Sequence, residues 1–265
     1  MTRKLPTIAD LRATKGKRQM TMLRYFSLDE ASAAEQAGID VASVPPELLT
    51  NPRYREVAPS VFSMTGKTHL EYGSADEYLR FCGQMMEAGA DALYCSGSIQ
   101  TVERLAQEYI PVVGHVGIVP ARATWTGGFK AVGRDAQSAI ALFEACKAYQ
   151  DAGAIAVEIE VVPVEVATAI AERLDILLWS MGAGGGCDAQ YLFAEDILGE
   201  GKSRLPRHAK VYRNFAAEYE RLQAERIAAF GEFVADVETG AFPQDKHLVR
   251  MKDAEHEAFL RGIGA

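Results

Sequence analysis

Short apolar strands alternate with helices along most of this chain, and that alternation limits the folds it can adopt. Parallel strands need crossover helices between them, so this rhythm predicts a parallel sheet covered by helices. An eighth, weaker strand is expected near Ile197 and Leu198. The seven clear predicted strands are Gln19 to Phe26, Asp40 to Val44, Ser60 to Met64, Ala90 to Cys95, Ile110 to Val116, Ala154 to Pro163 and Ile176 to Met181.

Local signals mark several joints between helices and strands. Ser27 to Glu30 has the spacing of a capping box that begins a helix, and Gly38 is placed to end that helix. The tripeptide Ala-Gly-Ala occurs at residues 88–90 and again at 152–154, which indicates the same helix-to-strand turn twice. Thr7 to Lys15 is expected to form a short amphipathic helix that closes one end of a barrel.

Eight strands alternating with helices favour an α/β fold, the (β/α)8 TIM barrel. A doubly wound open sheet is the competing architecture. The glycine run Gly182 to Gly186 is weak evidence for it, because the run comes late and lacks the acidic residue that dinucleotide binding requires. We predict a single domain over residues 1–265, with residues 206–265 as a C-terminal helical extension that contains helices from Val211 to Phe233 and from Asp253 to Arg261.

The composition argues against several classes of partner. A net charge of −8 and a pI near 5.3 oppose binding along a nucleic-acid backbone. No apolar run reaches transmembrane length, so no membrane partner is expected. The four cysteines have neither metal-site spacing nor a disulfide framework, which fits a reducing compartment. We expect a cytoplasmic protein that acts on a small molecule.

Two carboxylates stand in the apolar strand from Ala154 to Pro163. Burying an ionised carboxylate is costly unless it is paired, so their presence needs a reason. Glu158 and Glu160 are two residues apart and therefore lie on the same side of the strand. Glu160 is nearer the carboxyl end, where a TIM barrel has its active site, and we expect it to be catalytic. Glu158 is expected to be a structural partner; an ion pair across the barrel is the alternative for either residue.

Further candidates follow the carboxyl ends of the other strands. His115 has glycines on either side that leave room for a ligand, although a satisfied core histidine is the alternative. Cys95 and Cys187 are candidate nucleophiles or acids, with inert burial as the commoner outcome. The loop from Gly127 to Lys130 is either a mobile lid or an ordinary turn. The remaining candidates are Ser43, Glu47, Lys67, His69, Tyr94 to Ser98, and Gly184 to Asp188.

Three motifs, in this order, resemble the ketopantoate hydroxymethyltransferase family, and the similarity covers most of the chain. The resemblance implies a (β/α)8 barrel of the phosphoenolpyruvate mutase and isocitrate lyase group. It also implies a homo-oligomeric enzyme that moves a one-carbon unit from methylenetetrahydrofolate to the enolate of a branched 2-oxo acid. The motifs are IPVVGHVGIVP from Ile110 to Pro120, GGFKAVGR from Gly127 to Arg134, and IEVVPVE from Ile159 to Glu165.

The resemblance also implies roles for individual residues. Glu160 matches the base that removes the proton next to the carbonyl, and His115 matches the histidine that contacts the oxo acid. Tyr94 and Ser96 stand where the family has a lysine and a glutamate. The expected substrate-binding residues are Tyr94, Ser96, Lys67, Ser43 and Gly184.

The chain departs from the family at the metal site. The resemblance implies a magnesium ion held by aspartates after the second and third strands, where this chain has Pro46 with Glu47, and then Gly66. Magnesium prefers carboxylate and water oxygens, so these replacements argue against the usual site. Glu47 and Glu158 are the candidate substitutes, and the cofactor is left open.

Two functions are consistent with these residues. The first is a divergent enzyme of this family that acts on a small 2-oxo acid through an enolate, by hydroxymethyl transfer or by related carbon–carbon bond formation or cleavage. Glu160 would then be the general base and His115 would orient the substrate, while Tyr94, Lys67 or main-chain amides would stabilise the enolate. The second is a non-catalytic barrel that serves as a binding or regulatory subunit.

Overall fold

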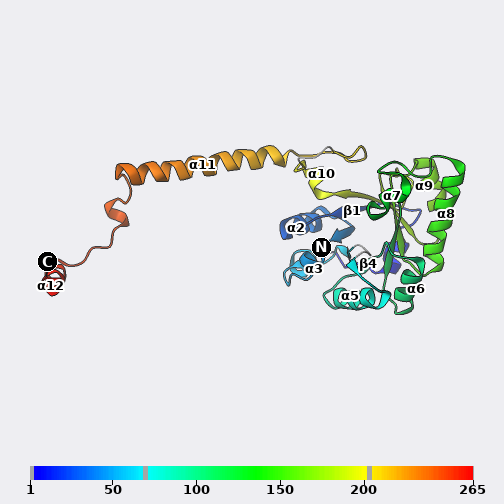
Figure 1. The fold of residues 1–265 in the computed structure, drawn as a ribbon, viewed down its shortest axis with the longest axis horizontal. Coiled ribbons are helices and arrows are strands. Elements are labelled where there is room, and N and C mark those ends of the chain that lie inside the picture. Colours follow the sequence, from blue (N-terminus) through cyan, green and yellow to red (C-terminus); the bar gives the residue numbers. More distant parts are fainter. Residues whose placement is uncertain (1–2, 68–70, 202–204, 265) are drawn as a thin grey trace. The chain divides into compact units, whose positions relative to one another are not determined.

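The computed structural model describes residues 3–67, 71–201 and 205–264. Over these residues, eight parallel strands close into a barrel in sequence order, with helices around it (Figure 1). This confirms the (β/α)8 barrel and excludes the open sheet. The strands are β1 (Met20–Arg24), β2 (Val41–Val44), β3 (Phe62–Thr65), β4 (Ala92–Tyr94), β5 (Val112–Gly117), β6 (Ala156–Glu160), β7 (Leu177–Met181) and β8 (Ala189–Phe193).

The helices begin and end where capping residues satisfy their free backbone groups. Ser27 and Glu30 form the expected capping box of α2, and Gly38 ends that helix with a φ of 85°. None of the helices in the described ranges is both long and apolar enough to span a membrane. The barrel helices are α1 (Ile8–Arg12), α2 (Leu28–Ala37), α3 (Pro46–Leu49), α4 (Tyr54–Val57), α5 (Ala75–Glu87), α6 (Ile99–Gln107), α7 (Ala123–Thr126), α8 (Ala136–Asp151), α9 (Val164–Ala171) and α10 (Ala194–Leu198).

The eighth strand lies earlier than the sequence suggested. The expected position at Ile197 and Leu198 is wrong, because both residues belong to α10. Closing the barrel requires a strand that pairs with β1, and β8 does so in register from Met20 opposite Ala189 to Arg24 opposite Phe193. The loop between β7 and β8 holds no helix, so the last strand follows the glycine run directly.

The interior of the barrel is apolar at the amino ends of the strands. One buried cluster combines inward-facing residues from all eight strands with Leu11, and Ile8 packs against it. The short helix α1 therefore closes this end, as expected. The inward-facing members of the cluster at this end, called the lower layer below, are Met20, Met22, Val41, Phe62, Met64, Ala92, Val113, Ala156, Leu177, Trp179 and Ala189.

The chain divides into two compact units, residues 1–213 and residues 214–265. The second unit contains α11 (Phe215–Thr239), a 3-10 turn (Asp245–His247) and α12 (Asp253–Ile263). The first of these helices begins later than the predicted Val211, because the Asn214 side chain caps it by accepting a hydrogen bond from the Ala217 N–H. The single-domain assignment, with an extension from residue 206, stays a prediction.

Candidate active site

Side chains at the carboxyl ends of the strands surround a cavity of about 600 Å³. This is the end at which TIM barrels place their active sites. Its lining combines charged and aromatic groups from most of the strands. The lining residues are Arg24, Ser43, Pro45, Pro46, Glu47, Gly66, Lys67, Glu71, Tyr94, His115, Pro120, Glu158, Glu160, Met181, Tyr191 and Phe193.

The alternation of side chains along the strands explains why these residues face the cavity. Residues two apart in a strand lie on the same face. In β6, Ala156 belongs to the lower layer, and Glu158 and Glu160 follow it in two-residue steps. In β5, His115 follows the lower-layer residue Val113 in the same way. The two carboxylates and the histidine therefore lie on the inner face of the barrel, above the lower layer and toward the carboxyl ends of the strands.

His115 lies between the two carboxylates of β6. Glu160 Oε2 is 3.2 Å from His115 Nε2, and Glu158 Oε2 is 3.9 Å from His115 Nδ1. The Tyr94 hydroxyl forms a 2.8 Å hydrogen bond with Nδ1. Nε2 is buried without a hydrogen-bond partner in the described structure, since the approach of Glu160 does not have hydrogen-bond geometry. The imidazole is therefore fixed through one nitrogen, and the other is left for a ligand.

Burial changes the protonation of two groups around this histidine. The pKa of Glu158 is raised to about 7: burial is the largest cause, the charge of His115 opposes it, the charge of Glu160 adds to it, and the charge of Arg24 opposes it. Glu158 Oε1 is buried and has no hydrogen-bond partner among the described residues. Burial, followed by the charge of Glu158, also raises the pKa of Tyr94, so its side chain stays a phenol at neutral pH. The site thus holds two groups that carry a proton near neutrality.

The backbone at Glu160 is held on both sides. Val161, directly after it, has a φ of 50°, a left-handed conformation that is strained for a β-branched residue. The Val161 N–H donates to the Met181 carbonyl at 2.8 Å, and the Ile118 N–H donates to the Glu160 carbonyl at 3.0 Å. A Cβ on Gly117 would lie only 2.1 Å from that carbonyl oxygen. Gly117 is therefore needed for β5 to approach Glu160 this closely.

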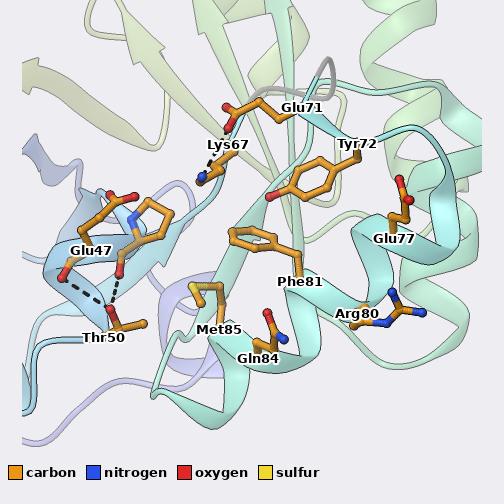
Figure 2. Close-up of a pocket in the computed structure, with 11 residues that line it drawn as sticks. Glu47, Thr50, Lys67, Glu71, Tyr72, Glu77, Arg80, Phe81, Gln84 and Met85 are labelled. Atoms are coloured by element: carbon orange, nitrogen blue, oxygen red, sulfur yellow. Dashed lines mark hydrogen bonds and ion pairs between the residues drawn. The ribbon is translucent and has the colours of Figure 1, made fainter.

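A second cavity has a volume of about 440 Å³ (Figure 2) and shares lining residues with the first. Both are lined by Pro46, Glu47, Lys67 and Glu71. The Lys67 ammonium points toward Glu71, and its Nζ lies 3.3 Å from Glu71 Oε2 (Figure 2). Lys67 therefore stands at the border of the two cavities with its charge paired.

Most of the residues expected from the sequence meet at the main cavity. Ser43, Glu47, Lys67, Tyr94, His115, Glu158 and Glu160 line it. Two others, Ser96 and Gly184, do not line it, and His69 lies outside the described residues.

Other candidates lie away from the cavity. Asp188 pairs with Lys15 at 2.8 Å, beside the start of β8. Cys95 and Cys187 are buried, and burial raises the pKa of both thiols, that of Cys187 to about 12. Such thiols are poor nucleophiles. The burial of Cys95 and Cys187 therefore fits the alternative that both are inert.

Sequence reasoning missed Arg24, Met181, Tyr191 and Phe193, which also line the cavity. Arg24 is the last residue of β1, and its Nη1 donates to Ser43 Oγ at 2.9 Å. The signal for it was present in the sequence. Met20 and Met22 belong to the lower layer, so the next inward position on that strand is Arg24.

The described residues of the cavity form no ready-made cluster of metal ligands. In the part of the chain that the structure describes, no three His, Cys, Asp or Glu side chains converge as metal ligands. His115 Nδ1 is occupied by Tyr94, and the guanidinium of Arg24 adds positive charge to the same cavity. Magnesium needs oxygen ligands in octahedral geometry, so a nitrogen already bonded to Tyr94 and a nearby guanidinium do not favour such a site. The roles of Glu47 and Glu158 as substitute metal ligands stay predictions.

The fold and the cavity define a TIM-barrel enzyme with acid–base groups at the carboxyl ends of its strands. The family model for ketopantoate hydroxymethyltransferase matches residues 62–245. A 3-methyl-2-oxobutanoate hydroxymethyltransferase of Halalkalibacterium halodurans is 37% identical over 201 residues, which cover 74% of this chain and 70% of the relative. Another, of Geobacillus kaustophilus, is 32% identical over 267 residues, with 92% and 93% covered. The chain belongs to the ketopantoate hydroxymethyltransferase family.

Solved structures agree on the fold at low sequence identity. An oxaloacetate acetylhydrolase has a TM-score of 0.55 at 12% identity, with 90% of this chain and 98% of that chain covered. A phosphonopyruvate hydrolase, solved with oxalate and Mg++, has a TM-score of 0.52 at 15% identity, with 97% and 98% covered. The family model and the relatives at 32–37% identity confirm the family resemblance and the expectation of an enzyme.

Proposed function

We propose that this chain acts on a small 2-oxo acid through an enolate, with Glu160 as general base and His115 orienting the substrate. The overall reaction would be hydroxymethyl transfer, or a related formation or cleavage of a carbon–carbon bond. The observation that carries the proposal is the 3.2 Å approach of Glu160 Oε2 to His115 Nε2 inside the cavity. Relatives named 3-methyl-2-oxobutanoate hydroxymethyltransferase support this substrate class.

The first chemical step is removal of a proton from the carbon next to the carbonyl. Glu160 takes this proton, the C–H electron pair becomes the carbon–carbon double bond of the enolate, and the carbonyl π electrons move to oxygen. Negative charge then grows on that oxygen. Buried hydrogen-bond donors that stabilise this charge lower the activation free energy of the step. The protonated form of Glu158 is such a donor.

The hydrogen bond between Tyr94 and His115 supports the proposed role of the imidazole. When the phenol donates to Nδ1, a neutral ring carries its hydrogen on Nε2, which has no protein partner in the described structure. Nε2 can then donate to an oxygen of the oxo acid. This contact would hold the reacting carbon beside Glu160, which is the orienting function expected of the residue.

Other features of the function rest on the resemblance and on the composition. Methylenetetrahydrofolate as the one-carbon donor, the homo-oligomer and the cytoplasmic location stay predictions. So does the expectation that nucleic acids and membranes are not partners.

Solvent-deuterium exchange tests the proposal directly. Proton NMR would follow loss of the C3 proton of 3-methyl-2-oxobutanoate in D₂O, and a parallel assay would measure product with methylenetetrahydrofolate, each with magnesium and with EDTA. Wild-type protein should exchange the proton, and the exposed variant Glu165→Gln should do so at the same rate. If neither exchange nor product is detected with any small 2-oxo acid, the enzymatic proposal fails and the non-catalytic barrel is favoured.

A further inference from the structure

We propose that Arg24 and Ser43 form a carboxylate-binding subsite that holds the acid group of the small 2-oxo acid. The inference rests on the proposed function, because it concerns the same cavity and the same class of substrate. In this proposal, the positive charge that binds the carboxylate of the substrate is the guanidinium of Arg24.

Arg24 forms no ion pair with a carboxylate among the described residues, although its charge acts on the nearby Glu158. Its side chain donates to the neutral Ser43 hydroxyl and also interacts with the Tyr191 side chain. Two other half-buried cations of the barrel have carboxylate partners: Arg55 lies 2.6 Å from Asp91, and Lys67 lies 3.3 Å from Glu71. A third, Arg122, donates instead to the backbone carbonyls of Ser96 and Gly97. A half-buried guanidinium that lines a cavity without a carboxylate partner is suited to an anionic ligand.

Neighbouring strands hold the guanidinium in place before any ligand binds. Arg24 is in register with Ser43 on β2 and with Phe193 on β8. Its Cζ lies 5.8 Å from the centre of the Phe193 ring and 5.3 Å from that of Phe26. Cation–π contacts of this kind stabilise the side chain in one orientation, which lowers the entropy lost on binding.

The hydrogen-bonding capacity of Arg24 fits a carboxylate. A guanidinium has five N–H donors in a planar fork, and Ser43 accepts one of them. The fork matches the two oxygens of a carboxylate, and such bidentate bonds are stronger than neutral ones. The Ser43 hydroxyl, which accepts from Arg24, can donate its own hydrogen to the same ligand.

The position of Arg24 also fits the proposed reaction. Arg24 is on β1, whereas His115 is on β5 and Glu160 is on β6, and all three line one cavity. A 2-oxo acid bound by its carboxylate at Arg24 would direct its carbonyl and the adjacent carbon toward the other side of the barrel. A residue of β1 then binds the carboxylate, and a residue of β6 removes the proton.

Binding of the oxo acid without a divalent metal tests the subsite. Isothermal titration calorimetry would measure the affinity of 3-methyl-2-oxobutanoate in excess EDTA for wild type, Arg24→Gln and Arg24→Lys. Loss of a charge-assisted bond should weaken binding by about 10- to 100-fold in Arg24→Gln. Arg24→Lys keeps the charge but loses the fork, so its affinity should lie between those of wild type and Arg24→Gln. This variant provides the test if Arg24→Gln does not fold. The exposed variant Arg173→Gln should bind like wild type.

A ligand without the acid group sharpens the test. Arg24→Gln should leave the weak affinity for 3-methyl-2-butanone unchanged, because this ketone has no carboxylate. Equal binding of the oxo acid by Arg24→Gln and wild type, or wild-type binding that requires magnesium, would overturn the subsite even if wild type still exchanges deuterium. Normal Arg24-dependent binding without any exchange would support the subsite and refute the enolate proposal.

Discussion

The interior of the barrel has two layers that differ in character although they are built from the same strands. The lower layer, at the amino ends, is apolar and buried. The upper layer, at the carboxyl ends, consists of the cavity residues, among them Arg24, His115, Glu158 and Glu160. Each strand passes from one layer to the other by the same two-residue alternation. The comparison therefore separates the part of the barrel that stabilises the fold from the part that is available for chemistry.

The two layers also differ in how many buried polar atoms lack a hydrogen-bond partner among the described residues. Lower-layer side chains such as Phe62 pack among other apolar groups, and one such atom, Trp179 Nε1, lies in this layer. In the upper layer, His115 Nε2 and Glu158 Oε1 are buried without hydrogen-bond partners in the described structure. Unsatisfied buried polar atoms cost free energy, so the upper layer is expected to lower stability while it prepares contacts for a ligand.

A large-to-small substitution in the lower layer should have the largest effect on stability. Phe62 is 2% exposed, and Phe62→Ala should lower the free energy of unfolding by about 3–5 kcal/mol, because a cavity is left in the core. Chemical denaturation would measure this change. The control Phe129→Ala, at a side chain that is 74% exposed, should change stability by less than about 0.5 kcal/mol. Similar losses in the two variants would contradict the assignment of stability to the lower layer.

Glu158 should make the stability of the protein depend on pH. Its pKa is about 7 in the folded chain against an ordinary value of 4.5, so the folded state binds the proton more tightly than the unfolded state. The resulting stabilisation is complete below about pH 4.5 and is lost as the pH rises through about 7, by an amount on the order of 3 kcal/mol. Denaturation of Glu158→Gln across this range should lack this decline.

The matched control for that measurement is Glu165→Gln, at an exposed position of α9. It should keep the wild-type decline in unfolding free energy with pH. If Glu158→Gln and wild type give parallel curves, Glu158 is ionised in the folded protein and the described character of the upper layer is wrong.

Gly117→Ala should affect activity through the position of Glu160. The new Cβ would meet the Glu160 carbonyl oxygen at 2.1 Å, so the strands must separate and the carboxylate must move. A displacement of about 1 Å can cost about 100-fold in rate, which deuterium exchange would measure. The control Gly83→Ala, on α5 with open space around the new Cβ, should leave the rate unchanged and slightly raise helix stability. Full activity in Gly117→Ala would show that Glu160 does not need this close approach.

The fold could be predicted from the sequence because its signals are local. The composition of the strands, the capping box at Ser27 and the glycine at residue 38 each specify a boundary without reference to the rest of the chain. The eighth strand was misplaced for the opposite reason. Its position depends on pairing with β1 across the closure of the barrel, and the sequence from Ala189 to Phe193 is only partly apolar.

The candidate site was predictable where a motif or a strand end marked a residue. Glu160 and His115 were expected at the cavity, and the structure places both there. Ser96 and Gly184 follow strands too, yet they do not line the cavity, because the loops after the strands turn in directions that strand periodicity does not determine. Arg24 was missed because a terminal arginine on a strand is commonly exposed, and its contact with Ser43 becomes visible only when the barrel closes.

The central claim is that Glu160, rather than its neighbour Glu158, removes the proton that starts the reaction. The most direct measurement is the rate of deuterium exchange into 3-methyl-2-oxobutanoate by Glu160→Gln and Glu158→Gln under the same conditions. The account predicts a loss of about 10²- to 10⁴-fold for Glu160→Gln, because the base is removed. It predicts a loss within about tenfold for Glu158→Gln, because the amide keeps a hydrogen-bond donor. Wild-type exchange in Glu160→Gln, or the larger loss in Glu158→Gln, would contradict it.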